Sequence, residues 1–232
     1  MARTIIAELL ARNARHAESL PDDHFAAVED SQSPAVVSVC CSDSRVSQEG
    51  MWDVEEPGWL FTVANIGNQT WDSYGGETVV SGDVLYPLLY AEPHTEVAAI
   101  VGHTGCGAVT ATLKEVQGDD TDFPAGVEQR IEWLRPVVEA GLDDSRVDPD
   151  REVSLVDQLV EYNVDRQVAC LRESEDVPDE TTILGFVYDF QGVYGDVRGR
   201  SYLVNHGGET DTDLLAEDVP DAYEAHVKRL LE

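Results

Sequence analysis

Four short runs of β-branched and other apolar residues constrain the fold of this 232-residue chain more than any other feature. They span residues 34–41, 59–65, 96–102 and 181–190, lengths and compositions typical of buried strands. Between them lie segments with apolar residues at helical spacing. Because strands alternate with helices along the chain, we predict an α/β fold with a mostly parallel sheet.

The remaining segments complete an expected sheet of four to five strands flanked by helices. A fifth strand is expected at the sheet edge over residues 200–205. The N-terminal 30 residues carry a helical pattern that Pro21 ends. Further helices are expected over residues 77–90, 108–116, 127–140, 153–171 and 220–231.

No internal repeat and no clear linker divides the sequence, and a hydrophobic content of 42% is enough to bury the core of one large domain. We therefore expect a single domain over residues 1–232. Within it we distinguish a helical arm (1–30), an α/β core (34–116), a helical insert (117–180) and C-terminal strands with a helix (181–232).

Two short motifs follow two of the predicted strands. Residues 41–45 (Cys-Ser-Asp-Ser-Arg) lie at the carboxyl end of the first strand, and residues 103–107 (His-Thr-Gly-Cys-Gly) lie at that of the third. Open α/β sheets bind ligands at these ends, and the motifs meet if the first strand lies between the second and the third. Cys41, His103 and Cys106 can then converge. Three such ligands are one short of the tetrahedron of structural zinc sites, so they leave a position for water, as catalytic zinc sites do.

The Cys-x-Asp-Ser-Arg and His-x-x-Cys-Gly motifs, about 60 residues apart, resemble those of the β-class carbonic anhydrases. The resemblance covers residues 34–116 and extends more loosely through the N-terminal helix and residues 185–194. It implies an α/β domain whose N-terminal helix packs on a partner subunit. It also implies reversible hydration of carbon dioxide to bicarbonate by a zinc-bound hydroxide, with one zinc ion per subunit, in a homodimer or a dimer of dimers.

The same resemblance assigns roles to individual residues. Cys41, His103 and Cys106 are expected to be the zinc ligands. Asp43 and Arg45 are expected to be a catalytic pair, in which Asp43 accepts a hydrogen bond from the zinc hydroxide and Arg45 keeps Asp43 ionised and correctly turned.

Gly107 matches the glycine whose backbone N–H binds substrate in the family, a role that needs close backbone approach. Two departures from the family patterns limit what can be transferred. The segment that corresponds to Arg-Asn-x-x-Asn is residues 64–68 (Ala-Asn-Ile-Gly-Asn), so a subunit contact made by that arginine is not expected. Residues 38–41 lack the Trp-x-Gly-Cys pattern of bicarbonate-regulated members, so we predict no such regulatory site.

Two other functions stay open on the sequence alone. A branch of the family hydrolyses carbon disulfide or carbonyl sulfide with the same zinc set, and nothing in the metal motif excludes those substrates. Alternatively, Asp43 or another residue closes the zinc tetrahedron, and the protein is a non-catalytic module stabilised by zinc. Bound zinc without hydration activity at any pH would identify such a module.

The formal net charge is −31, from 46 acidic and 15 basic residues spread along the chain, and all basic residues except Lys114 and Lys228 are arginine. This pattern resembles proteins of halophilic microbes. It repels phosphate backbones and anionic membranes, so we expect neither nucleic acid nor a membrane as a partner. The only apolar run near the N-terminus, residues 5–11, contains Glu8 and precedes no cleavage site, which argues against a signal peptide. With four cysteines, too few for a disulfide scaffold, a cytoplasmic protein is expected.

Overall fold

The computed structural model describes residues 2–231, and the chain divides into two compact units with the boundary between Gln32 and Ser33. The first unit contains helix α1 (Ala2–Ser19), in which no side chain is buried. The helix ends two residues before Pro21, as its sequence pattern predicts.

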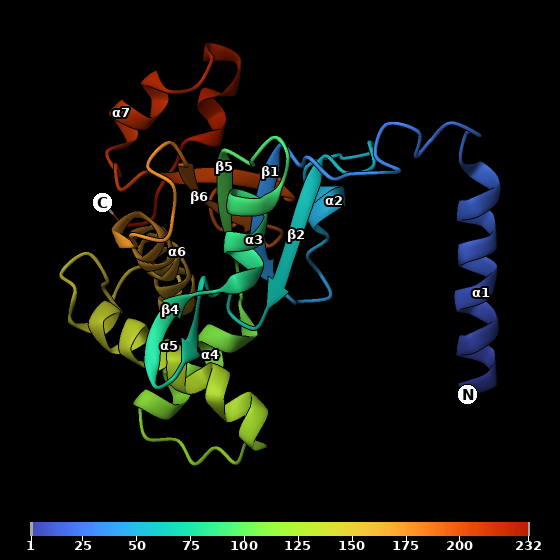
Figure 1. Cartoon of the computed structure of the whole chain (residues 1–232). Coiled ribbons are helices and arrows are strands. Elements are labelled where there is room, and N and C mark those ends of the chain that lie inside the picture. Colours follow the sequence, from blue (N-terminus) through green and yellow to red (C-terminus); the bar gives the residue numbers. More distant parts are fainter. Residues whose placement is uncertain (1, 232) are drawn as a thin grey trace. The chain divides into compact units, whose positions relative to one another are not determined.

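The second unit is built around a five-stranded sheet with the order β2-β1-β5-β6-β7 (Figure 1). The first four strands in this order are parallel, and β7 runs antiparallel to β6 at the sheet edge. This confirms the predicted α/β class and the mostly parallel sheet. The strands are β1 (Val36–Cys41), β2 (Leu60–Asn65), β5 (Val97–His103), β6 (Thr182–Asp189) and β7 (Arg200–His206).

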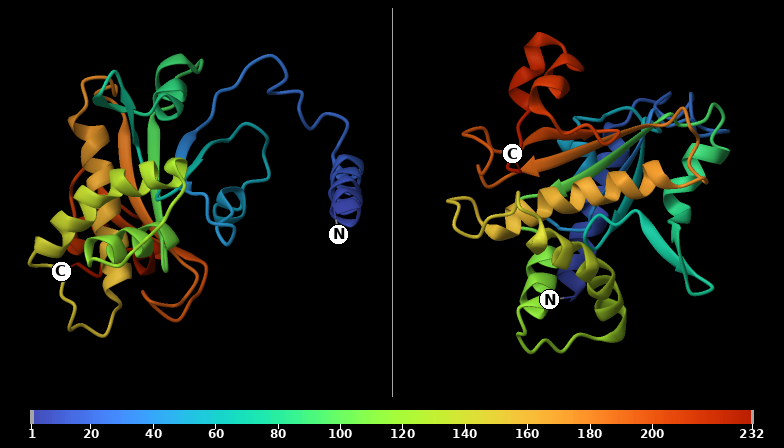
Figure 2. Two further views of the ribbon diagram at one scale, coloured as in Figure 1. Left: turned by 90° about the horizontal axis from the view of Figure 1, so that it is seen from below. Right: turned by 90° about the vertical axis from the view of Figure 1, so that its left-hand side faces the viewer.

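Helix α6 lies along β5 and β6, and α4 and α5 pack on its outer side, as Figure 2 shows. Helix α3 contacts β1 and β2 and shares one hydrophobic core with α6. None of the helices described over residues 2–231 combines the length and the apolar character needed to cross a membrane. The helices of this unit are α2 (Gln48–Met51), α3 (Gly82–Tyr90), α4 (Gly107–Val116), α5 (Ala125–Asp143), α6 (Leu155–Glu173), α7 (Thr212–Glu217) and the 3-10 helix η1 (Asp221–His226).

Two glycines let α6 approach the sheet closely. A Cβ atom added to Gly102 of β5 or to Gly185 of β6 would lie 2.7 Å from a methyl group of Val164, which is fully buried on α6. Val164 therefore fills a notch between the two strands, and this notch exists only because residues 102 and 185 are glycines. Because β5 leads directly to His103, this packing fixes the helix relative to the motif that follows the strand.

The face of the sheet opposite α6 is less completely covered by other elements. Trp52 and Trp59 lie over apolar side chains of β1, β5 and β6 and leave a small apolar cavity of about 130 Å³. A larger groove of about 920 Å³ continues past β7 toward residues 218–226. This face therefore exposes apolar surface within the second unit.

The structure corrects the prediction of one helix over residues 77–90. Residues 77–80 form strand β4 (Glu77–Val80), which pairs antiparallel with β3 (Trp71–Tyr74), and α3 starts only at Gly82. The turn between the two strands uses Gly75 and Gly76, both with positive φ, a conformation that glycine adopts at little cost. Hairpin pairing of this β-branched segment overrides its helical spacing.

The expected closing helix over residues 220–231 is also wrong. Only η1 forms there, after which Val227 makes a parallel bridge to Leu203 of β7. Arg229 and Leu231 then turn into the interior, where they are 4% and 3% exposed. Burial of both residues favours an irregular backbone over a surface helix.

Candidate metal centre

The structure brings together the three side chains that the sequence predicts as metal ligands. Cys41 ends β1, His103 ends β5, and Cys106 directly precedes α4. Their ligand atoms all lie within 4.8 Å of one another, and all three residues are buried. Over residues 2–231, no other set of three or more histidine, cysteine or carboxylate side chains is arranged in this way.

The hydrogen bonding of His103 leaves one ring nitrogen available to a metal. Its Nδ1 lies 3.0 Å from the carbonyl oxygen of Thr104, which can only accept, so Nδ1 carries the proton. Its Nε2 is buried and has no hydrogen-bond partner among the described residues. Buried polar atoms are rarely left unpaired in this way. An imidazole nitrogen beside two thiols is a donor set that zinc prefers, so the residues present fit a zinc ion.

The two thiols are coupled. Their sulfur atoms lie 3.9 Å apart. The hydrogen bond between them lowers the pKa of Cys41 to about 4 and raises the pKa of Cys106 well above its ordinary value, an effect that burial of Cys106 increases. One thiolate is therefore stabilised before any metal binds. Metal ligation favours the second thiolate too, because the deprotonated sulfur is the ligand.

Asp43 and Arg45 form a bidentate ion pair beside these ligands. Arg45 donates from Nε to Oδ1 of Asp43 at 2.8 Å and from Nη2 to Oδ2 at 2.6 Å, and its backbone N–H donates to Oδ1 at 2.9 Å. The side-chain hydrogen bonds from Arg45 hold the pKa of Asp43 well below its usual range. Oδ2 of Asp43 lies 3.9 Å from Nε2 of His103, and Nη2 of Arg45 also donates to the carbonyl oxygen of Gly105 at 3.2 Å. The pair is thereby tied to the loop that carries two of the candidate ligands, His103 and Cys106.

Gly107 is the first residue of α4 and follows Cys106 directly. A Cβ atom added there would meet no atom within 4 Å. The backbone at Gly107 therefore borders open space. Its N–H has no acceptor within the helix, because it belongs to the first turn. Its placement next to a ligand is compatible with the expected contact to substrate.

Two buried carboxylates, which the sequence motifs do not predict, accept hydrogen bonds from the loop between His103 and Cys106. Asp157 in the first turn of α6 accepts the backbone N–H of Gly105 at 2.8 Å. Asp189 at the end of β6 accepts the hydroxyl of Thr104 at 3.3 Å. The Ser154-x-x-Asp157 spacing is a helix-capping signal, but it predicts only where α6 begins and not the contact with residue 105.

Phe190 is a third residue that the sequence analysis did not identify as part of the site. Its ring centroid lies 5.9 Å from that of His103, at an interplanar angle of 28°. The guanidinium carbon of Arg45 lies 4.6 Å from the same ring. Its sole sequence signal is its position directly after β6, since that strand neighbours β5 in the sheet.

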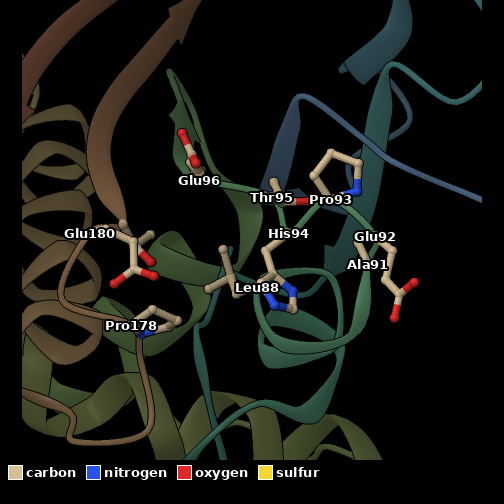
Figure 3. Close-up of a pocket in the computed structure, with 10 residues that line it drawn as sticks. Leu88, Ala91, Glu92, Pro93, His94, Thr95, Glu96, Pro178 and Glu180 are labelled. Carbon is tan, nitrogen blue, oxygen red and sulfur yellow. The ribbon is translucent and has the colours of Figure 1, made fainter.

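A hollow of about 400 Å³ lies at the opposite, amino ends of the strands (Figure 3). Glu92, His94, Glu96 and Glu180 are among the residues that line it, and none of the three metal-ligand candidates is. These side chains do not gather their ligand atoms as Cys41 and its partners do. The carboxylates also disfavour an anionic ligand, so this hollow is not the candidate active site.

Comparison with known proteins agrees with the motifs. The sequence matches the carbonic anhydrase family over residues 36–194. It is 32% identical over 174 residues to the carbonic anhydrase of Pseudomonas aeruginosa, an alignment that covers 72% of this chain and 74% of that protein. It is 30% identical over 195 residues to carbonic anhydrase 2 of Mycobacterium tuberculosis, covering 83% of this chain and 84% of that protein.

Solved structures show the same fold. A β-carbonic anhydrase of Aspergillus fumigatus superposes with a TM-score of 0.68 at 21% identity, covering 97% of this chain and 99% of that one. One of two tetrameric β-carbonic anhydrases of Sordaria macrospora gives a TM-score of 0.69 at 17% identity, covering 88% and 98%. Taken with the sequence matches, these similarities show that the chain is an enzyme of the carbonic anhydrase family with the fold of the β-class structures.

Proposed function

We propose that this enzyme catalyses the reversible hydration of carbon dioxide to bicarbonate at one zinc ion per subunit, held by Cys41, His103 and Cys106. The observation that carries the proposal is the imidazole of His103: a ring nitrogen lies within 4.8 Å of both thiol sulfur atoms, and the buried Nε2 has no hydrogen-bond partner among residues 2–231. Zinc bound there would lower the pKa of a water molecule from 15.7 to about 7 and so supply a hydroxide nucleophile at neutral pH.

In this proposal Asp43 orients the nucleophile. Its carboxylate is ionised at neutral pH, because the hydrogen bonds from Arg45 depress its pKa. Oδ1 of Asp43 accepts two N–H groups of Arg45, whereas Oδ2 accepts only Nη2 and keeps a second lone pair. Oδ2, 3.9 Å from Nε2 of His103, can therefore accept a hydrogen bond from a hydroxyl group beside the ligands, which turns the lone pair of that hydroxyl oxygen toward carbon dioxide.

Arg45 and Gly107 have supporting roles in the proposal. Arg45 keeps the carboxylate turned, since its Nη2 is shared between Asp43 and the carbonyl oxygen of Gly105. Gly107 offers its backbone N–H to an oxygen atom of the substrate at the positive end of the α4 dipole. The absence of a side chain leaves room for that oxygen.

Stopped-flow hydration assays at high salt, from about pH 6.5 to about pH 9, test the proposal when zinc content is measured on the same sample. We expect activity that rises with pH and scales with zinc. Parallel assays with carbon disulfide and carbonyl sulfide separate the hydration function from the hydrolase alternative. A full complement of zinc without hydration at any pH would contradict the proposal.

We also propose a homodimer or a dimer of dimers, in which α1 packs on a second copy of the chain. Ile5, Ile6, Leu9 and Leu10 of α1 are 52–66% exposed, so this helix presents a stripe of large apolar side chains to solvent. Such a stripe favours association. Light scattering should show wild-type dimers or tetramers and a smaller species for Leu9→Asp, whereas a monomeric wild type would contradict the proposal.

We propose further that the enzyme works at high salt in the cytoplasm. A net charge of −31 destabilises the compact state by self-repulsion, which salt screens. The four cysteines are free, and ligation needs reduced thiols, which suits a reducing compartment. The urea concentration at the unfolding midpoint should rise with KCl, most steeply below about 1 M, where the screening length falls to about 3 Å. A midpoint independent of salt would contradict the proposed requirement for high salt.

A further inference from the structure

We propose that Phe190 is a positioning residue of the metal centre, whose ring holds the Arg45 guanidinium in its ion pair with Asp43. The relevance of this role to catalysis rests on the proposed function, but the contact itself can be tested without catalysis. Nothing in the motifs of the family resemblance points to this residue.

The contact with Arg45 has the geometry of a cation–π interaction. The guanidinium carbon lies 4.6 Å from the ring centroid, within the distance of about 6 Å at which such contacts are favourable. The N–H edges of the same group point to Asp43 and to the carbonyl oxygen of Gly105. The ring therefore lies against the guanidinium, while hydrogen bonds from Nε and Nη2 hold the same group to Asp43 and Gly105.

This contact matters because the Arg45 guanidinium is otherwise held only by its hydrogen bonds to Asp43 and Gly105, for which water competes. Its side chain is 48% exposed, and ion pairs at such exposure contribute little by themselves, since solvent competes for both partners. A ring against the guanidinium restricts the rotamers available to the long side chain. Phe190 thus raises the population of the bidentate arrangement.

The same ring also contacts His103. The two ring centroids lie 5.9 Å apart with an interplanar angle of 28°. The Nδ1 hydrogen bond to Thr104 fixes the rotation of the imidazole, and the phenyl ring limits its tilt. One side chain therefore contacts both the imidazole that offers Nε2 and the cation that holds Asp43.

Phe190 is itself well anchored. It follows the buried Asp189, whose carboxylate accepts the backbone N–H groups of Gln191, Gly192 and Tyr194 at 2.7–3.1 Å. The loop after the ring is therefore closed onto the end of β6. A ring on such a support can determine the position of Arg45 rather than follow it.

The test compares Phe190→Leu, which removes the π face but keeps apolar bulk, with Phe190→Tyr, which keeps the ring. Phe61→Leu is the matched control, because Phe61 is also a half-buried ring but lies on edge strand β2 beside Tyr86. The first readout is the NMR signal of the Arg45 Nε–H in the metal-free protein and its rate of exchange with solvent.

We expect Phe190→Leu to speed this exchange about two- to fivefold, the range for loss of a cation–π contact at an exposed site. Phe190→Tyr and Phe61→Leu should leave it at the wild-type rate. Unchanged exchange in Phe190→Leu, or an equal change in Phe61→Leu, would overturn the proposal. If Phe190→Leu does not fold, Phe190→Met serves in its place.

The second readout is kcat/KM for carbon dioxide hydration by the zinc-loaded enzyme. It should fall by a similar factor in Phe190→Leu and recover in Phe190→Tyr. Faster Arg45 exchange with a wild-type kcat/KM would overturn the catalytic part of the inference. Faster exchange in a protein whose wild type does not hydrate carbon dioxide would uphold the positioning role and contradict the proposed function instead.

Discussion

The tetrapeptide Asp-Ser-Arg-Val occurs twice in this chain, at residues 43–46 and 144–147, and it folds into the same turn both times. In each turn the arginine donates its backbone N–H and Nε to one carboxylate oxygen and Nη2 to the other. These distances are 2.6–2.9 Å in the first turn and 2.8–3.0 Å in the second. The valine N–H closes each turn to the aspartate carbonyl, at 2.9 and 3.0 Å.

The surroundings of the two turns differ completely. Arg45 contacts Phe190 and the loop that carries His103 and Cys106. Arg146 instead approaches Asp165 of α6 at 3.8 Å. Local sequence therefore determines the ion pair, whereas sheet topology determines what the pair is used for.

The second turn borders a buried ionic cluster. Asp165 accepts Nη2 of Arg229 at 2.8 Å, and Arg229 also lies 3.2 Å from Glu161, whose side chain is fully buried. Glu161 further accepts the Tyr194 hydroxyl at 2.5 Å and the backbone N–H groups of Leu230 and Leu231. This cluster joins α6 to residues 229–231 and contacts none of the metal-ligand candidates.

The largest difference between the surroundings of the two turns should appear when a candidate metal ligand beside the first turn is removed. Cys106→Ala leaves two of three ligands, so we expect loss of zinc and a fall of hydration to the uncatalysed rate. Metal analysis and stopped-flow kinetics on one sample measure both. The control is Cys170→Ala, a cysteine of α6 outside the ligand set, which should keep zinc. Retention of zinc and activity by Cys106→Ala would contradict the assignment.

The next largest effect is expected at the cluster beside the second turn. Arg229→Met leaves the buried Glu161 carboxylate without its cation, and breaking such a pair costs about 3 kcal/mol. Urea unfolding at constant salt measures the loss. The control is Arg135→Met, whose pair with Glu115 is partly exposed and should contribute less than about 1 kcal/mol.

The loss in Arg229→Met should depend on pH. Burial raises the pKa of Glu161 although Arg229 opposes the shift, so removal of Arg229 raises that pKa further. Stability from a group with a raised folded-state pKa is present at low pH and is lost as pH rises through that pKa. The variant should therefore be destabilised more at about pH 8 than at about pH 5. A loss that grows on acidification would contradict this account of the cluster.

The smallest expected effect comes from substituting the aspartate of each turn, which compares the two turns directly. Asp43→Asn should lower kcat/KM about 10- to 100-fold, the range for residues that orient a metal site. Asp144→Asn, in the matching turn, should change it about twofold at most, and each variant should lose less than about 1 kcal/mol of stability. An equal fall of activity in both variants would show that the turn, not its location, matters.

Much of the fold follows from local pattern. The four β-branched runs form the four parallel strands, and the glycine-rich turn at residues 105–107 precedes a helix. The failures lie at residues 77–80 and 227–231, where pairing with β3 and burial beside Glu161 decide the backbone. Helical periodicity reveals neither the hairpin pairing of residues 77–80 with the neighbouring β3 nor the burial of Arg229 and Leu231.

The site shows the same division. The motifs predict which three side chains meet, because parallel strand order places both strand ends together. The contacts of Phe190, Asp157 and Asp189 with the site depend on how β6 and α6 pack. Residue type alone gives no sign of these contacts, since aromatic and acidic residues also occur throughout the surface.

The glycine notch around Val164 has a consequence for how this sequence can vary. Alanine at position 102 or 185 adds a single methyl group, yet that group would overlap Val164 and displace α6. The first turn of α6 carries Asp157, which holds the backbone of Gly105. Substitutions of Gly102 or Gly185 would thus disturb the candidate metal centre through α6, so purifying selection for activity should extend to these two core glycines.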